Sequence, residues 1–371
     1  MEKIDTIVDF FNTLCPPALA SPQDTVGLQI RGRRDEIHTV FGALELNPSL
    51  WEKIEDHNPD FLYLHHPPLW KPLSCLDYND PWSNLLLNLY QKGISVLAHH
   101  TNLDAMVGGL ADEWLLHMGF DEKPSPIIAW NADDTFKVVT FVPHEHLDKI
   151  MHAAFSSGGG KIGQYDKCSF SLEGTGTFRP LEGSRPYSGQ HNIMERTSEM
   201  RLEIPANKRD LPLLVEAIKA IHPYEEPVID VYNLKQTDKG NTGLGRLVHL
   251  AHPLTPSELS QRVHSYISTA GNPILPYQPC FEENMQLDRL VLCPGSGGSL
   301  IKEVVKHKAD VFLTGDLSHH QIEALRFQGI TVIPIPHSDG ERSAMKGVFH
   351  RFRQMAHTRG IKINMVFEDE M

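Results

Sequence analysis

The sequence predicts an α/β fold in two parts: a discontinuous core domain with a mixed, largely parallel sheet, and an inserted ferredoxin-like α+β domain. At both ends of the chain, short apolar runs alternate with amphipathic helical stretches, which is typical of parallel strands with helices on both faces. The middle follows the βαββαβ order of a ferredoxin-like module. Residues 121–135 are rich in Pro, Ser, Asn and Asp, which indicates a domain boundary. We therefore expect the core over 1–125 and 239–371, and the insert over 126–238.

The first part of the core begins with a helix and then alternates strands and helices. Residues 3–14 place apolar side chains at helical spacing, and Pro16-Pro17 ends that pattern. The strands expected next cover 24–30, 39–45, 60–64 and 94–98, and the helices cover 48–57 and 81–92.

The insert and the second part of the core follow in the same way. In the insert, strands are expected over 136–141, 167–178, 199–204 and 227–233, with helices over 145–155 and 210–221. From Gly243 the α/β alternation resumes, with helices over 256–268, 299–307 and 318–327, strands over 287–293, 311–313 and 331–335, and a final helix that begins near His337.

The composition restricts the class of protein. The chain has 371 residues and a formal net charge of −13, which argues against a general nucleic-acid-binding surface. Its five cysteines are scattered and form no CxxC pair, as expected of free thiols in a reducing compartment. The N-terminus lacks a basic signal-peptide region, and no apolar run approaches the roughly 18 residues of a membrane-spanning helix. We expect a cytoplasmic protein without a membrane segment.

The most informative stretch is the apolar run 62–64, which delivers His65 and His66 where Pro67-Pro68 forbids the strand to continue. Consecutive side chains of a strand point to opposite faces, so both imidazoles can reach one site only if the backbone turns there. The prolines favour such a turn. The alternative is a solvated pair of histidines at a strand end.

Two further groups of polar side chains also follow predicted strands. Residues 100–104 read His-Thr-Asn-Leu-Asp, and His337 stands four residues before Glu341, on one face of a helix start. Open α/β sheets collect their ligands at the carboxyl ends of their strands, so the three strand ends are expected to meet in one cleft. By itself, the His337–Glu341 pair has the alternative of an exposed electrostatic contact.

Three imidazoles and two carboxylates exceed the needs of one tetrahedral ion and suit a pair of divalent ions bridged by a carboxylate or water. Asp104 is the expected bridge. Such a pair lowers the pKa of a bound water from about 16 towards 7, which predicts a hydrolase. The ligand types accept Zn, Mn, Fe, Co or Ni, so the identity of the two ions stays open.

These motifs, together with Gly108-Gly109-Leu110, Thr314-Gly315-Asp316 and His337-Ser338-Asp339-Gly340-Glu341, resemble the dinuclear-metal YqfO/YbgI-type family, the GTP cyclohydrolase I type 2 homologues that are also called NGG-interacting-factor-three-like proteins. The segments 24–29 and 243–246 and the insert motif His222-Pro223-Tyr224-Glu225-Glu226-Pro227 are also similar to family segments. The resemblance implies a homohexamer and these metal ligands: His65, His66, Asp104, His337 and Glu341. Relatives usually carry an Asp-containing strand end at Leu44-Glu45-Leu46-Asn47, so Glu45 receives no role.

The function that follows is a metal-dependent hydrolase of the cyclohydrolase kind, acting on a nucleotide or related heterocycle. Candidates for proton transfer are His100, Asp316 and His319, with a helix cap as the alternative for Asp316 and solvent exposure for His319. The Gly-rich segment 295–299 either cradles a phosphate or only turns, and Arg246 either meets an anionic substrate or pairs with an acidic side chain. The competing hypothesis is a non-catalytic metal-binding scaffold whose insert binds a ligand or partner.

Overall fold

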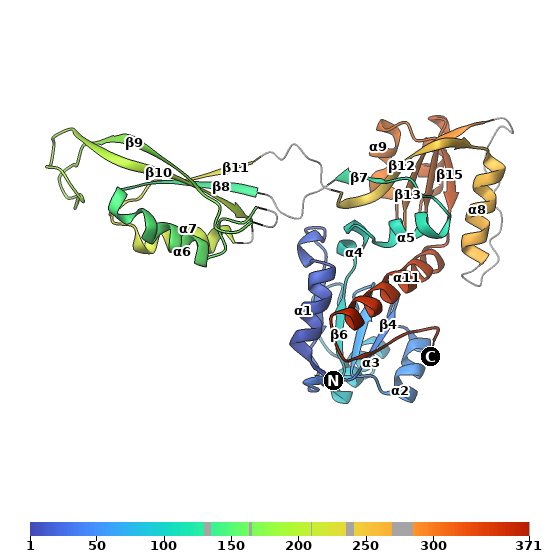
Figure 1. Ribbon diagram of the computed structural model, residues 1–371. Coiled ribbons are helices and arrows are strands. Elements are labelled where there is room, and N and C mark those ends of the chain that lie inside the picture. The colour runs from blue at the N-terminus through green and yellow to red at the C-terminus, as the bar shows by residue number, and fades with distance from the viewer. Residues whose placement is uncertain (130–134, 163–164, 209, 235–240, 269–284, 371) are drawn as a thin grey trace. The chain divides into compact units, whose positions relative to one another are not determined.

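The computed structural model describes residues 1–370 except 130–134, 163–164, 209, 235–240 and 269–284 (Figure 1). The chain forms two compact units. The core unit combines Met1–Asn131 with Gly240–Met371, and the inserted unit is Ala132–Lys239. Part of the segment expected as a domain boundary, together with Cys280, lies outside the described residues. The four described cysteines are free thiols.

The first sheet of the core unit has the strand order β16-β4-β5-β6-β2. The strands β4 (Thr39–Ala43), β5 (Phe61–Leu64), β6 (Ser95–Ala98) and β16 (Asn364–Phe367) are parallel, and β2 (Gly27–Ile30) is antiparallel to β6. Side chains of α1 (Ile4–Leu14) pack on one face, and those of α2 (Pro48–His57) and α3 (Pro81–Lys92) pack on the other. Every residue of β5 is therefore buried, which explains its uninterrupted apolar sequence.

The second sheet of the core unit has the order β15-β14-β13-β12-β7. Its strands β13 (Leu287–Cys293), β14 (Val311–Thr314) and β15 (Thr331–Pro334) are parallel, whereas β12 (Gly243–Leu254) runs antiparallel to both β13 and β7 (Ser125–Ala129). The helices α9 (Ile301–Lys306) and α10 (His319–Phe327) pack on one face, and α5 (Leu110–His117) and α8 (Pro256–Ser268) border the other. The described residues of the core unit thus form two mixed five-stranded sheets and a short two-stranded one where the sequence predicted a single sheet, because apolar patterns mark strands but not the sheet that each strand joins.

A long helix, α11 (His337–Thr358), joins the two sheets (Figure 1). It follows β15 of the second sheet and leads into β16 of the first. Its buried side chains, which include Ala344, Val348 and Phe352, belong to one hydrophobic core that also takes in residues of both sheets. The short helix α4 (Thr101–Ala105) follows β6. These packing contacts fix the first turn of α11 against the carboxyl ends of the parallel strands.

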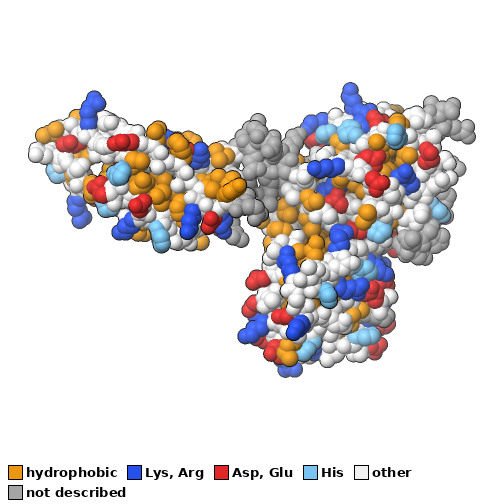
Figure 2. Space-filling model, viewed as in Figure 1, with side chains coloured by type: hydrophobic (Ala, Val, Ile, Leu, Met, Phe, Trp, Pro, Cys, Tyr) orange, Lys and Arg blue, Asp and Glu red, His pale blue; other side chains and the backbone are white. Residues whose placement is uncertain are grey.

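The inserted unit is a four-stranded antiparallel sheet with helices on one face. Its elements are β8 (Thr135–Val142), α6 (Leu147–Ser156), β9 (Phe170–Phe178), β10 (Glu195–Asn207), α7 (Leu211–Ile221) and β11 (Ile229–Asn233), and the strand order is β11-β8-β10-β9. Both helices pack on a core of their own with β8 and β10. Hydrophobic side chains are visible on the surface of this unit in Figure 2, and large exposed ones include Phe170, Leu172 and Leu213.

Most predicted elements are present, and several others escaped prediction. The helices expected over 48–57, 81–92 and 256–268 have those bounds. The elements α4, α5, β7, β12 and β16 were not predicted as such; of these, β7 contains Pro126 and β12 contains Gly243 and Gly245, which weaken a strand pattern. No helix in the described ranges combines the length and apolar character needed to cross a bilayer. On the face drawn in Figure 2, basic and acidic side chains are interspersed.

Candidate metal centre

The paired histidines are brought to one side by the turn that ends β5. The backbone N–H groups of His65 and His66 both donate to the carbonyl oxygen of Leu44, at 3.1 and 2.9 Å, so the chain leaves its regular ladder there. The buried Pro67 and Pro68 follow at once. As a result the two imidazole ring centres lie 5.0 Å apart, as the prolines in the sequence predicted.

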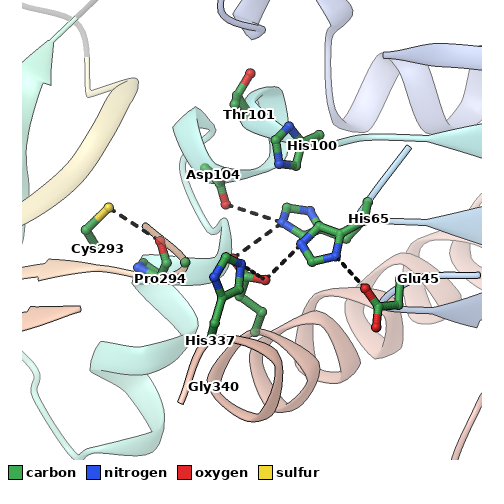
Figure 3. A network of polar contacts seen from close by, with 12 residues as sticks. Glu45, His65, His100, Thr101, Asp104, Cys293, Pro294, His337 and Gly340 are labelled. Carbon is green, nitrogen blue, oxygen red and sulfur yellow. Dashed lines mark hydrogen bonds and ion pairs between the residues drawn. The ribbon is translucent and has the colours of Figure 1, made fainter. Parts of the chain in front are cut away.

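The first turn of α11 supplies the next two side chains (Figure 3). Glu341 is buried, and its Oε2 lies 3.1 Å from Nε2 of His337, one helical turn away. The same oxygen lies 3.0 Å from Nε2 of His66, and Oε1 lies 3.9 Å from Nε2 of His65. One carboxylate from α11 therefore faces three imidazoles, two of which come from the end of β5.

Asp104, on α4, completes the group of five predicted ligands. Its Oδ1 lies 3.8 Å from Nε2 of His65. This oxygen, Nε2 of His65 and Oε2 of Glu341 are buried atoms without a hydrogen-bond partner among the described residues. Buried polar atoms without partners are unfavourable, and a divalent cation would satisfy all three. Imidazole nitrogen and carboxylate oxygen are also suitable donors for such a cation, so the residues fit a metal site.

Each imidazole of the cluster is anchored through Nδ1. Nδ1 of His65 contacts the carbonyl oxygen of His99 at 3.0 Å, Nδ1 of His66 contacts Oε2 of Glu45 at 3.1 Å, and Nδ1 of His337 contacts Oδ2 of Asp316 at 2.6 Å. Metal-binding histidines are typically oriented by such oxygen acceptors. The arrangement leaves Nε2 of each ring for the interior of the cluster.

A fourth imidazole has the same construction. Nδ1 of His100 lies 3.1 Å from both carboxylate oxygens of Asp24, which also accepts hydrogen bonds from the N–H and hydroxyl groups of Thr101. Ligand nitrogens of His65, His66 and His100 lie within 4.8 Å of one another, and a second such group joins His66, His337 and Glu341. Neither Glu45 nor Asp24 has a role that the sequence pattern predicts. The signal that was available for Glu45 is its position just past β4, at the edge where β5 and β6 end.

Burial and ion pairing shift the pKa values of the side chains in the cluster and so determine which of them carry a proton. Burial lowers the pKa of His65 to about 3, so its Nε2 is free to accept a ligand at neutral pH. The carboxylate of Glu341, 3.1 Å from Nε2, raises the pKa of His337 to about 9. Burial alone would raise the pKa of Glu341, but His337 and His66 hold it well below its usual range. Burial also raises the pKa of Asp104 to about 7. Positive charge at His337 thus balances an ionised Glu341, as a cation would.

The glycine turn after β13 lies against this cluster. Gly295 has φ +67°, and a β-carbon built on it would lie 2.4 Å from Oε1 of Glu341. Its carbonyl oxygen accepts hydrogen bonds from the N–H groups of Gly315 and Asp316. The glycine is thus explained by its backbone conformation and by the close approach of Glu341, which favours the turn interpretation of 295–299.

Three other candidates have clear positions. Ser318, and not Asp316, caps α10, in a capping box with Gln321. His319 is exposed on α10, and its ring contacts that of His320. All five N–H groups of the buried Arg246 are used, because its guanidinium binds Asp112 and the carbonyl oxygens of Gly243, Gly245 and Met106. The ion-pair interpretation of Arg246 is therefore correct.

Comparison with known proteins gives matches along the whole chain. A family model described as Duf34/NIF3 (NGG1p interacting factor 3) matches residues 2–370. A Bacillus subtilis (strain 168) protein named "GTP cyclohydrolase 1 type 2 homolog" is 29% identical over 360 residues, which cover 97% of this chain and 94% of the relative. A solved Bacillus cereus protein related to NIF3 is 26% identical, with a TM-score of 0.70 and coverage of 98% of this chain and 96% of that chain. Staphylococcus aureus protein SA1388 has a similar fold, with a TM-score of 0.77, 24% identity and coverage of 98% and 95%.

Proposed function

Since the chain belongs to the Duf34/NIF3 family, we propose that it is a divalent-metal protein whose centre lies between the ends of β5 and α4 and the start of α11. The proposed ligands are His65, His66, Asp104, His337 and Glu341. The observation that carries the proposal is the position of Glu341, whose buried carboxylate faces three imidazoles while Oε2 has no hydrogen-bond partner.

We propose two ions per chain. Glu341 directs Oε1 towards His65 and Oε2 towards His66 and His337, so its carboxylate is suited to serve two neighbouring ions. Asp104, whose Oδ1 lies 3.8 Å from Nε2 of His65, and Glu341 would both offer carboxylate oxygens to the pair of ions. The donor set of nitrogen and oxygen accepts Zn, Mn, Fe, Co or Ni.

The proposed activity is hydrolysis of a nucleotide or a related heterocycle. A pair of divalent ions supplies Lewis acidity and a water nucleophile that is active near neutral pH. The chain supplies the proton transfer, for which His100 is the best-placed candidate, because its ring centre lies 5.1 Å from that of His65 and Asp24 holds its Nδ1. Asp316 is better suited to orient His337, and His319 is exposed on α10. The name of the B. subtilis relative supports the substrate class.

The first experiment measures metal per chain by mass spectrometry in protein purified without chelator, beside Glu341→Gln and Asp104→Asn. The proposal predicts about two ions in the natural protein and a loss in both variants, because each change removes a charged oxygen donor. The exposed Glu216→Gln, on α7 of the inserted unit, is the matched control and should keep both ions. Folded natural protein without metal, after exposure to each of the five candidate ions, would contradict the proposal.

The activity is tested separately. Metal-loaded protein and Glu341→Gln are incubated with GTP, and ring-opened or dephosphorylated products are detected by chromatography. Turnover that is present only in the natural protein supports the hydrolase. Full metal occupancy without turnover of GTP or other nucleotides favours the second function, a non-catalytic metal-binding scaffold. The exposed Phe170 and Leu172 on β9 of the inserted unit supply the apolar surface that a partner would need.

Two structural proposals accompany this function. We infer that the inserted unit is ferredoxin-like, because its βαββαβ order and its strand order β11-β8-β10-β9 follow that pattern. We also propose a homohexamer, as the family resemblance implies. Native mass spectrometry should then give a mass about six times that of the 41.8 kDa chain, and a monomeric mass would contradict the assembly.

A further inference from the structure

An exposed tryptophan follows the paired histidines on an anchored stretch of backbone. Pro67 and Pro68 are buried, and the N–H group of Leu69 donates to Oε1 of Gln29 at 2.7 Å. The side-chain Nε2 of Gln29 in turn donates to the carbonyl oxygen of Thr25. Trp70 comes next and remains 53% exposed. The backbone that precedes this large exposed side chain is thus fixed by buried prolines and a hydrogen bond.

Trp70 contacts His100, whose ring in turn contacts two of the proposed metal ligands. Its ring centre is 5.0 Å from that of His100, and the two planes are nearly perpendicular, at 84°. The ring of His100 is in turn 5.1 Å from His65 and 5.8 Å from His66. Other large apolar side chains of this stretch are also exposed, namely Leu73, Leu76, Tyr78 and Trp82. Of the described side chains in this stretch, Trp70 is the one whose ring contacts a histidine of the cluster.

The geometry of this contact leaves indole surface available. An edge-to-face pair engages at most one face of each ring, and with 53% of Trp70 exposed, about half of this residue is open to solvent. Aromatic side chains beside a reaction centre are suited to stacking on flat heterocycles, because such rings offer a π-face whatever their substituents.

We infer that Trp70 is a substrate-positioning residue, which stacks on a planar heteroaromatic ring such as a nucleobase and holds it over His100 beside the metal centre. This inference rests on the proposed function and deepens it, because it names the part of the substrate that is recognised. A stacked ring would cover the exposed indole face and would lie beside His100, the candidate for proton transfer.

The test compares two probes that share a phosphate and differ in the ring. Isothermal titration calorimetry measures the binding of guanosine monophosphate and of ribose 5-phosphate to the zinc-loaded natural protein, Trp70→Ala, Trp70→Phe and Trp82→Ala. Base–aromatic stacking predicts that Trp70→Ala weakens the binding of guanosine monophosphate roughly 5- to 150-fold, whereas Trp70→Phe keeps most of the affinity. Binding of ribose 5-phosphate should not change. Trp82, an exposed tryptophan at the start of α3, is the matched control.

The outcomes separate this inference from the proposed function. Equal affinity of guanosine monophosphate for the natural protein and Trp70→Ala overturns the stacking role and leaves the metal centre untouched. If Trp70→Ala loses the same affinity for both probes, Trp70 maintains the structure of the site and does not stack on the ring, which also overturns the inference. A change in native mass in Trp70→Ala, with unchanged affinity, assigns the indole to contacts between copies of the chain. Zinc content is measured in every variant and should stay at the natural level in Trp70→Ala, so a failed metal centre is recognised independently.

Discussion

The carboxylate of Glu341 occupies the space that a side chain at Gly295 would need. A β-carbon at Gly295 would lie 2.4 Å from Oε1 of Glu341 and 3.4 Å from Nε2 of His337. The turn after β13 and the first turn of α11 are therefore matched to each other, although the two residues are far apart in the sequence. This contact connects the Gly-rich segment to the proposed metal centre.

Gly295→Ala should weaken metal binding by about 10- to 100-fold, because the new methyl group displaces the carboxylate of Glu341. Gly329→Ala is the matched control, since Gly329 also has a left-handed backbone, φ +74°, but has open space around it. Both changes should cost about 1–2 kcal/mol of stability through backbone strain. Competition with a metal-binding dye measures the affinity. Equal affinities in the two variants would show that the approach of Glu341 to Gly295 does not matter for binding.

Asp316→Ala should also reduce metal affinity, by about 10- to 100-fold, because it removes the acceptor that orients His337 through Nδ1. Asp316→Asn should lose less metal affinity than Asp316→Ala, since the amide oxygen of Asn can still accept that hydrogen bond. The exposed Asp288 on β13 provides a control position, where Asp288→Ala should leave the affinity unchanged. If Asp316→Ala bound zinc as tightly as the natural protein, the ring of His337 would be held by other contacts.

Arg246→Met should destabilise the core unit by roughly 3 kcal/mol, because it removes the buried cation that pairs with Asp112 and the donor of hydrogen bonds to three carbonyl oxygens. Affinity for guanosine monophosphate should be unchanged in protein that is still folded, since all five N–H groups already have partners within the protein. Thermal unfolding and calorimetry measure the two quantities. A lost affinity with unchanged stability would return Arg246 to the role of a substrate contact.

The inserted unit should lose stability in mild acid through His222. Burial lowers the pKa of this imidazole from 6.5, and Glu199 opposes that shift. Its Nδ1 accepts a hydrogen bond from the N–H group of Tyr224, so the neutral ring must donate from Nε2 to the carbonyl oxygen of Phe141. The unfolded state therefore binds the proton more readily, and stability falls as the pH drops below about 6.5.

His222→Gln should reduce this pH dependence, because the amide offers a donor and an acceptor without a charge. Hydrogen exchange of the β8 amides at about pH 7 and about pH 5, corrected for intrinsic rates, gives the change in opening free energy. The same pH dependence in the natural protein and in His222→Gln would exclude His222 as its source.

The sequence by itself determined the local elements and the kinds of ligand. Apolar periodicity located α2, α3 and α8, since helix and strand patterns depend on neighbouring residues alone. The prolines after His66 predicted the turn that brings His65 and His66 together, and the four-residue spacing of His337 and Glu341 predicted a shared helical face. The family resemblance is confirmed by the match along the chain.

The tertiary structure alone decided which distant groups meet. Nothing local shows that β5 and β15 belong to different sheets, or that α11 joins them through one hydrophobic core, because strand pairing and helix packing are long-range choices. The same holds for the acceptors Glu45, Asp24 and Asp316, each of which pairs with an imidazole at least 21 residues away. A carboxylate becomes an anchor for a histidine only when the fold brings both to hydrogen-bond distance, and that proximity depends on how the whole core packs.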